Sequence, residues 1–237
     1  MTKDEVKAHQ QKLKDAGFDS GPIDGLWGRK TENATRAWEK ATGQKLPSDT
    51  GRNLIELPGG LAKASNAMHP ALGSQEREAT FGGPFDWVQR PLPDNRENIE
   101  IRGGWEEANI ITVDLPELAE ATNGQYKRMR CNKRASKQLQ DLWKAWGAAG
   151  LLQQVKTYDG SFVPRLIRGS TRSLSNHAYG TAFDINYEWN QLGRTPAAPG
   201  KTGSVWELVS IAHQHGFFWG GFFARGDGMH FEVCQIV

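Results

Sequence analysis

Apolar residues at the start of the chain recur at the spacing of a helix. Val6, Leu13 and Ala16 fall on one face of a first helix, which we expect to end at Gly17. A loop dense in glycine, proline and aspartate follows, and Thr31 is placed to cap a second helix. The inner face of this second helix is expected to consist of Ala34, Trp38 and Ala41, and Gly43 is expected to end it. A third short helix is expected to be capped by Ser48. The pattern predicts a small three-helix module over residues 1–56.

Beyond this module the pattern changes twice. Residues 57–75 are rich in glycine, alanine, serine and proline and show weak periodicity, so we interpret them as a linker. The segment 99–118 then alternates apolar and polar residues, which predicts short strands joined by turns. Because strands and helices are mixed without a regular repeat, we predict an α+β domain over residues 76–237.

Two amphipathic helices are expected within this second domain. The first lies within residues 132–150 and ends at Gly150, and the second is capped by Ser204 and stopped by Gly216. Large apolar residues recur at helical spacing in the first helix, and we assign them to the core: Leu139, Leu142, Trp143 and Trp146. Sugar stacking is the alternative role for some of the nine tryptophans.

Composition narrows the class of protein. The chain has 237 residues, of which 38% are hydrophobic and 24% charged, as in ordinary globular proteins. A net charge of +2 gives no reason to expect nucleic-acid binding, and no apolar stretch is long enough to span a bilayer. Cys131 and Cys234 lie far apart and form no CxxC pair, so we expect two buried free thiols rather than a disulfide or a cysteine–zinc site.

The stretch Ser173–Asn186, SLSNHAYGTAFDIN, carries the first candidate chemistry. The glycine and the β-favouring residues after its histidine argue against a helix, so we interpret NHAYG as a turn and TAFDIN as a strand. On that strand Ala182, Asp184 and Asn186 share one face, because side chains alternate. His177 comes from the turn and can curl back toward Asp184.

A second predicted strand, near the C-terminus, supplies further candidate residues that could lie beside His177 and Asp184. In GDGMHFEV, His230, Glu232 and Cys234 alternate with apolar residues. If the two strands are neighbours, two imidazoles and one carboxylate meet and leave a fourth position for water, which is the open arrangement of a catalytic zinc site. Asp227, three residues before His230, is close enough to take the proton of that water. Glu232 could hold an imidazole in place.

The first module resembles the peptidoglycan-binding domain of many wall hydrolases. That family shows a helix, a G-(Y/F)-x-x-G-x-(I/V)-D-G-x-(F/W)-G loop and a T-x-x-A-(V/T)-x-x-(F/W) helix. One departure is Glu39, where the family usually has glutamine. The matching residues are Gly17, Phe18, Gly21, Ile23, Asp24, Gly25, Trp27, Gly28, Thr31, Ala34 and Trp38.

The second domain resembles the zinc D-Ala-D-Ala carboxypeptidase and L-Ala-D-Glu endopeptidase family, the VanY-like peptidases. Its signature is S-x-H-x-x-G-x-A-x-D followed by (D/E)-x-x-H. The matching residues are Ser175, His177, Gly180, Ala182, Asp184, Asp227 and His230. The resemblance implies a hedgehog-type fold with a central antiparallel sheet and flanking helices. It covers roughly residues 80 to 237.

The resemblance also implies roles for particular residues. His177, Asp184 and His230 would be the Zn²⁺ ligands, and Asp227 would be the general base. The family has an arginine upstream of the first ligand that binds substrate, and both Arg165 and Arg168 are candidates, with Arg165 favoured. Ser175 is taken as a substrate-binding residue, although it could instead cap the turn. The remaining histidines are expected to be structural: His9, His69, His213 and His215.

Together these features predict a peptidoglycan hydrolase that cleaves a peptide bond in the stem peptide or cross-link. A D,D-carboxypeptidase that removes terminal D-Ala and a non-catalytic wall-binding protein are the alternatives. The N-terminus is polar, without an apolar signal core. We therefore expect a phage-type endolysin, made in the host cytoplasm and acting on the wall after release. Its expected partner is bacterial peptidoglycan, with no nucleic acid and no stable membrane insertion, and we expect a monomer.

Overall fold

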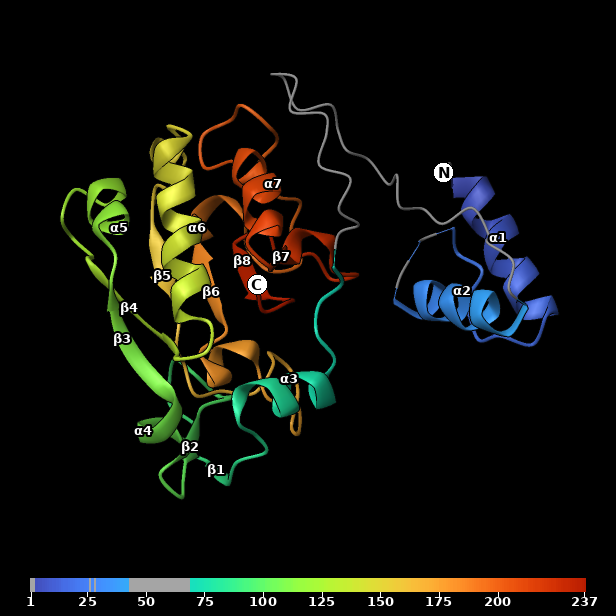
Figure 1. Ribbon diagram of the computed structural model, residues 1–237, viewed down its shortest axis with the longest axis horizontal. Coiled ribbons are helices and arrows are strands. Elements are labelled where there is room, and N and C mark those ends of the chain that lie inside the picture. Colours follow the sequence, from blue (N-terminus) through green and yellow to red (C-terminus); the bar gives the residue numbers. More distant parts are fainter. Residues whose placement is uncertain (1–2, 26, 28, 43–68) are drawn as a thin grey trace. The chain divides into compact units, whose positions relative to one another are not determined.

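The computed structural model describes residues 3–25, 27, 29–42 and 69–237 (Figure 1). The chain divides into two compact units, Met1–Met68 and His69–Val237, which are considered separately below. The expected third helix, capped by Ser48, and most of the expected linker lie outside the described residues. None of the described helices combines the length and the apolar character needed to cross a membrane.

The N-terminal unit contains two helices, α1 (Lys3–Asp15) and α2 (Arg29–Thr42). Leu13 of α1 packs with Ala34 and Trp38 of α2, as the helical spacing predicted. The expected cap was wrong: α2 begins at Arg29, so Thr31 lies inside the helix, where its buried hydroxyl donates to the Ser20 carbonyl (3.1 Å).

A buried glutamine holds the loop between these two helices. The Gln10 side chain donates to Asp24 Oδ1 (3.0 Å) and to Thr31 Oγ1 (3.2 Å), and its Oε1 accepts from the Gly25 N–H (2.9 Å). Gln10 is 1% exposed. Because the amide satisfies loop groups that would otherwise be buried without partners, it fixes the loop to α1.

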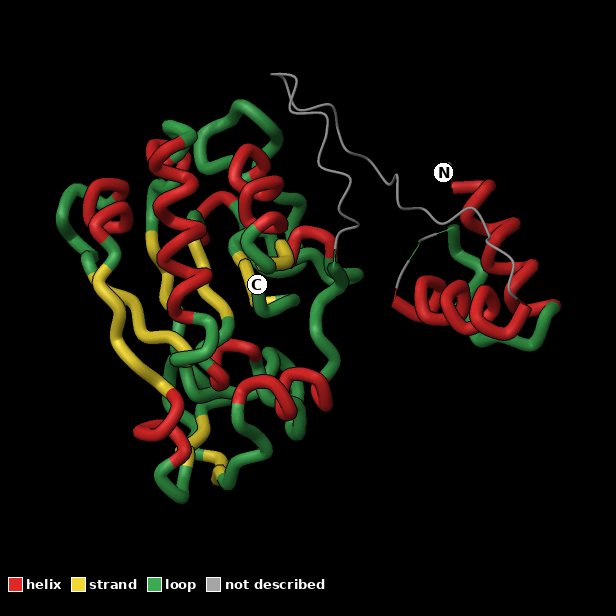
Figure 2. Tube along the Cα trace, viewed as in Figure 1, coloured by secondary structure: helices red, strands yellow, loops and turns green. Residues whose placement is uncertain are grey.

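The C-terminal unit is an α+β structure, as predicted (Figure 2). Its strands are β1 Trp87–Gln89, β2 Ile99–Ile101, β3 Ile110–Asp114, β4 Arg128–Asn132, β5 Tyr158–Gly160, β6 Ala182–Ile185, β7 Phe217–Trp219 and β8 His230–Val233. Its helices are α3 Ser74–Phe81, α4 Trp105–Asn109, α5 Pro116–Ala121, α6 Ser136–Ala148 and α7 Trp206–Gln214. Its 3-10 turns are η1 Leu152–Gln154, η2 Asn176–Tyr179, η3 Tyr187–Trp189 and η4 Gly220–Phe222.

The strands form two two-stranded antiparallel sheets, β1–β2 and β3–β4, and one antiparallel sheet in the order β5-β6-β8-β7. Helices α6 and α7 lie over this sheet in Figure 1. The fully buried Trp143 and Trp146 of α6 pack against Phe183 of β6, so the predicted core role of these tryptophans is confirmed. Phe231 of β8 stacks on Phe183, so one face of β6 and β8 belongs to the core.

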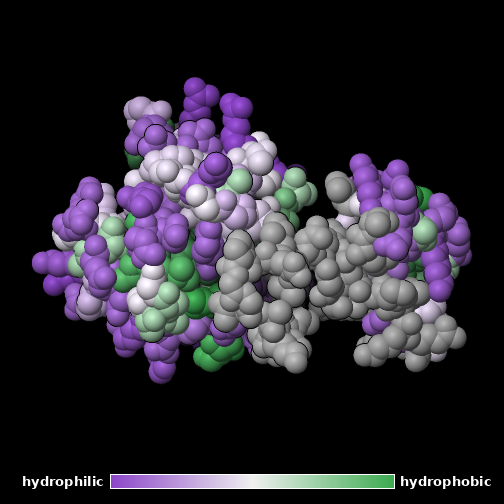
Figure 3. Space-filling model, turned by 90° about the horizontal axis from the view of Figure 1, so that it is seen from above, coloured by the Kyte–Doolittle hydropathy of each residue, from purple (hydrophilic) through white to green (hydrophobic). Residues whose placement is uncertain are grey.

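Two predictions about the secondary structure of this unit were wrong. In the segment 99–118, which was expected to hold only short strands, α4 and the start of α5 lie among the strands. Gly103 and Gly104 both have positive φ and turn the chain into α4, and Pro116 starts α5. Asn186 was expected to continue the polar face of β6, but its φ of 59° ends the strand at Ile185. Hydrophilic residues cover much of the surface seen in Figure 3.

Candidate metal centre

His177 is presented by a single tight turn, η2. Ser175 caps this turn, because its Oγ accepts from the His177 N–H (3.3 Å), and Gly180 ends it with a φ of 66°. A side chain at Gly180 would meet Ile110 Cδ1 at 2.7 Å and the Asn132 backbone nitrogen at 2.8 Å. The glycine is therefore required both by its backbone conformation and by close packing on β3–β4. The Ser175 hydroxyl is committed to the turn.

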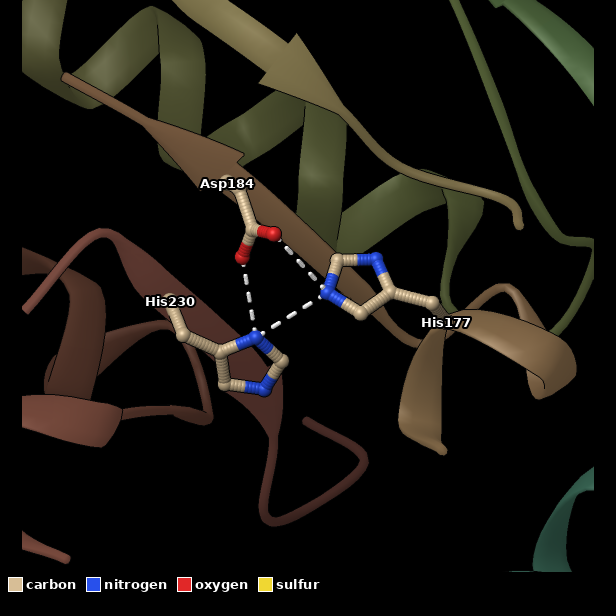
Figure 4. A group of neighbouring side chains, drawn as sticks. All are labelled: His177, Asp184 and His230. Carbon is tan, nitrogen blue, oxygen red and sulfur yellow. Dashed lines mark hydrogen bonds and ion pairs between the residues drawn. The ribbon is translucent and has the colours of Figure 1, made fainter. Parts of the chain in front are cut away.

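Asp184 and His230 reach the same place because they are directly paired across β6 and β8. Asp184 Oδ1 lies 2.9 Å from His230 Nδ1, and Asp184 Oδ2 lies 3.2 Å from His177 Nε2. The two imidazole nitrogens are themselves 3.1 Å apart. Figure 4 shows the three side chains converging from the turn and the two strands. All three are buried, and their candidate ligand atoms lie within 4.8 Å of one another.

The outer nitrogen of each imidazole has a fixed acceptor. His177 Nδ1 lies 2.6 Å from the Ser161 carbonyl oxygen, and His230 Nε2 lies 2.9 Å from Glu232 Oε2. Since a carbonyl and a carboxylate oxygen accept hydrogen bonds, each outer nitrogen carries a proton. When the rings are neutral, the lone pairs of His177 Nε2 and His230 Nδ1 therefore face each other and Asp184. A cation held between these three groups would be bound by all of them.

The charges around these rings support the same conclusion. Asp184 and Glu232 are 9% and 3% exposed, and within the described part of the chain neither pairs with a lysine or arginine. Burial would raise the pKa of Asp184, but the adjacent His177 and His230 hold it well below its usual range. Burial would lower the pKa of His230, but its bonds to Asp184 and Glu232 raise it to about 10. In the absence of a cation, His230 therefore carries a second ring proton, on the Nδ1 that faces Asp184, and a bound cation would replace that proton.

A divalent cation fits this donor set. Two neutral imidazoles, the Asp184 carboxylate and the Glu232 carboxylate behind His230 would balance a charge of +2 within the buried cluster. Imidazole and carboxylate ligands are typical of zinc, with three protein ligands in catalytic sites. The hydrogen bonds from the outer nitrogens to a carbonyl and a carboxylate are also typical of ligating histidines. The residues predicted to hold the metal are thus brought together.

Asp227 lies in the turn before β8, with an orphaned carboxylate oxygen. Its N–H donates to the Gly220 carbonyl (2.9 Å), and its own carbonyl accepts from the His230 N–H (3.2 Å). Its Oδ1 is buried and finds no hydrogen-bond partner among the described residues. Burial raises the pKa of the Asp227 carboxyl, although the neighbouring His230 opposes this shift. The carboxylate is held beside the metal ligands with one oxygen unused.

The two candidate arginines lie in different surroundings. The Arg165 guanidinium is partly buried, which lowers its pKa, while the charges of Asp184 and Asp227 oppose that shift. Arg168 is exposed and donates from Nη1 to Glu97 Oε2 (2.7 Å) and to Asn95 Oδ1 (2.8 Å). Arg165 therefore lies within electrostatic range of the site, whereas Arg168 is committed to a surface ion pair.

One hydrogen-bond acceptor in the site was not predicted. The group that accepts from His177 is the main-chain carbonyl of Ser161, and the residue type at that position gives no signal of this role. Glu232 contacts His230, as was expected from their shared strand face.

Among the other histidines, His9 bonds Thr35 Oγ1 (2.8 Å) and His215 Nδ1 bonds the Ile211 carbonyl (2.9 Å), which are structural roles. Cys131 and Cys234 are buried free thiols, as predicted.

Two protein-family models match the chain. Residues 168–233 match the model described as D-alanyl-D-alanine carboxypeptidase, and residues 2–48 match a putative peptidoglycan binding domain. The first match includes His177, Asp184, Asp227 and His230. The resemblance to both families is confirmed, each over its own segment of the chain. Comparison with curated proteins found no match, and comparison with solved structures found none either.

Proposed function

We propose that the protein is a zinc-dependent peptidase that cleaves a peptide bond in bacterial peptidoglycan. The observation that carries the proposal is the convergence of two imidazole lone pairs and the Asp184 carboxylate on one point, with their outer nitrogens already bonded. The match to a carboxypeptidase model and the accompanying wall-binding segment support peptidoglycan as the substrate.

Each residue around the proposed metal site has a role in this reaction. Zinc, held by His177, Asp184 and His230, would supply Lewis acidity that lowers the pKa of water to roughly 7 and polarises a carbonyl. Asp227 accepts the proton of the attacking water on its free Oδ1. It then passes that proton to the leaving amine as the peptide bond breaks. Arg165 donates to the carbonyl oxygen as negative charge develops there.

The site also favours Arg165 over Arg168 for this task. Within the described part of the chain, the guanidinium of Arg165 donates one hydrogen bond, to the Leu166 carbonyl (3.2 Å), and its remaining donors can serve a substrate. Arg168 would have to leave Glu97 and Asn95 first. Ser175 is buried and bonded to the turn, so we assign it to the presentation of His177 and not to direct substrate contact.

An endopeptidase acting on the stem peptide or cross-link is the form of the activity that we propose, within an endolysin that acts on the wall after release. A peptidase that is also held on the wall by its own binding segment is suited to cutting the mesh. The second candidate is a D,D-carboxypeptidase that removes terminal D-Ala, which is favoured by the description of the matching family model.

Mass spectrometry of peptides released from purified peptidoglycan tests the proposal. We expect new peptide termini that disappear with a chelator and return with zinc. Termini within the stem peptide or cross-link identify the endopeptidase, and release of free D-Ala alone identifies the carboxypeptidase. If no peptide bond is cut under any zinc condition, the proposal is wrong. A zinc content far below one ion per chain would then favour a wall-binding protein without activity.

A further inference from the structure

A buried arginine outside the metal site has an unusual set of neighbours. Arg77 of α3 is 7% exposed, and it forms no ion pair with a carboxylate in the part of the chain that the structure describes. Its guanidinium lies over the Tyr179 ring, 4.6 Å from the ring centre, and its Nη1 donates to Asn176 Oδ1 (3.0 Å). Buried cations are normally paired with an anion, so this arrangement requires another explanation.

Asn176 connects this arginine to the metal site. Its Nδ2 donates to Glu232 Oε2, the same oxygen that accepts from His230 Nε2 at 2.9 Å. The amide can satisfy both neighbours in only one orientation, because arginine offers only donors and an ionised carboxylate only acceptors. A continuous series of hydrogen bonds therefore runs from Arg77 through Asn176 and Glu232 to His230. We call these four residues the Arg77 relay.

The direction of each bond in the relay determines what it does. The positive charge of Arg77 polarises the Asn176 amide, which strengthens its donation to Glu232. The carboxylate is thereby held where it accepts the proton of His230 Nε2. If Glu232 moved away, the His230 proton could shift to Nδ1, and the lone pair that faces Asp184 would be lost. The relay thus acts on the tautomer of a metal ligand from a helix that lies nearly a hundred residues earlier in the chain.

We propose that Arg77 and Asn176 are positioning residues of the metal centre, which keep Glu232 against His230 so that its Nδ1 faces the ion. This inference rests on the proposed metal site. Neither residue touches the reacting atoms. Removing either should weaken zinc binding about 10- to 100-fold, the usual effect of losing a partner behind a ligating histidine.

Zinc affinity of the full-length chain, measured by competition with a chromogenic chelator, tests this proposal without using activity. Arg77→Met keeps most of the side-chain length and removes the donors, and Asn176→Ser shortens the amide so that it cannot bridge Arg77 and Glu232. Arg128→Met is the matched control, because Arg128 bonds a carboxylate, Asp114 (2.9 Å), on the surface of the same unit. Cobalt(II) spectra of the same proteins report the ligand geometry directly.

A double-mutant cycle separates a relay from a general loss of stability. In a Glu232→Ala background, Arg77→Met should have no further effect on zinc affinity, because the group through which Arg77 acts is gone. Arg77→Lys should recover part of the affinity through a single donor to Asn176. If Arg77→Met does not fold, Asn176→Ser and its own cycle with Glu232→Ala decide the question.

The outcomes distinguish this proposal from the proposed function. Wild-type chain that binds no zinc overturns both. Wild-type chain that binds zinc, with Arg77→Met and Asn176→Ser binding it equally tightly and giving unchanged cobalt spectra, overturns the relay alone. Equal losses of affinity in the wild-type and Glu232→Ala backgrounds also overturn the relay, because they would show an effect that does not pass through Glu232.

Discussion

Each unit of this chain buries a group of polar side chains, and the two groups differ in how they are satisfied. Around Gln10, one amide bonds a carboxylate, a hydroxyl and the main chain with each of its polar atoms. Around His230, two carboxylates and two imidazoles are packed together, and one nitrogen of each ring faces Asp184. Beside them, one oxygen of Asp227 finds no partner among the described residues. A polar cluster whose members satisfy one another stabilises a fold, whereas one that concentrates titratable groups and leaves an oxygen unbonded indicates a functional site.

The largest effect is expected from a substitution of Asp227, beside the His177, Asp184 and His230 cluster. Asp227→Asn keeps the shape of the side chain but removes its ability to accept a proton. We expect peptide release from purified peptidoglycan to fall about 10²- to 10⁴-fold. Zinc content per chain, measured by elemental analysis, should stay at the wild-type level because Asp227 is not a ligand. Full activity of Asp227→Asn would exclude the general-base role.

The next effect concerns zinc binding by the His177, Asp184 and His230 cluster. Zinc at about 100 times its dissociation constant should stabilise the C-terminal unit by about 2.7 kcal/mol, because it binds only the folded site. Thermal unfolding with and without zinc, followed by calorimetry, measures this difference. His177→Ala should abolish the zinc-dependent shift in Tm. A shift of wild-type size in His177→Ala would place the zinc elsewhere.

A smaller loss is expected in the complete cluster of the N-terminal unit. Gln10→Met leaves the buried Gly25 N–H and its neighbours without their acceptor and donors, at a cost of about 1–3 kcal/mol. Hydrogen exchange of the α1 amides in the full-length chain should become faster. Gln11→Met is the control, because Gln11 is exposed and bonds only Asp15 in its own helix (2.7 Å). Equal exchange in the two variants would contradict a structural role for Gln10.

The remaining prediction compares the two candidate arginines, Arg165 and Arg168. Arg165→Met should lower kcat/KM about 10²-fold, as when a donor to a developing oxyanion is removed. Arg168→Met should leave kcat/KM close to wild type, because it removes an exposed ion pair with Glu97. Steady-state kinetics on a defined wall peptide measure both. The reverse order of effects would identify Arg168 as the substrate-binding residue.

The convergence of His177, Asp184 and His230 could be predicted because each of them lies in a recognisable local sequence pattern. Asp184 and His230 follow the alternation of two strands, and those strands proved to be paired. The relay could not be predicted, since Arg77 and Asn176 are 99 residues apart and no local periodicity connects them. Helix α4 was missed because five residues are too few to show a helical repeat. Thr31 was misplaced because a capping signal does not fix which turn begins the helix.

The glycine that ends the His177 turn also limits how the candidate site could be redesigned. Gly180 is pressed against Ile110 and the Asn132 main chain, and the Asn132 N–H is bonded to the Gly180 carbonyl (2.8 Å). A larger residue at Gly180 would therefore displace the turn that carries His177. On the His230 side, the Phe223 ring centre lies 6.0 Å from that of His230. Libraries aimed at a new substrate preference should therefore vary Phe223 and leave the His177 turn untouched.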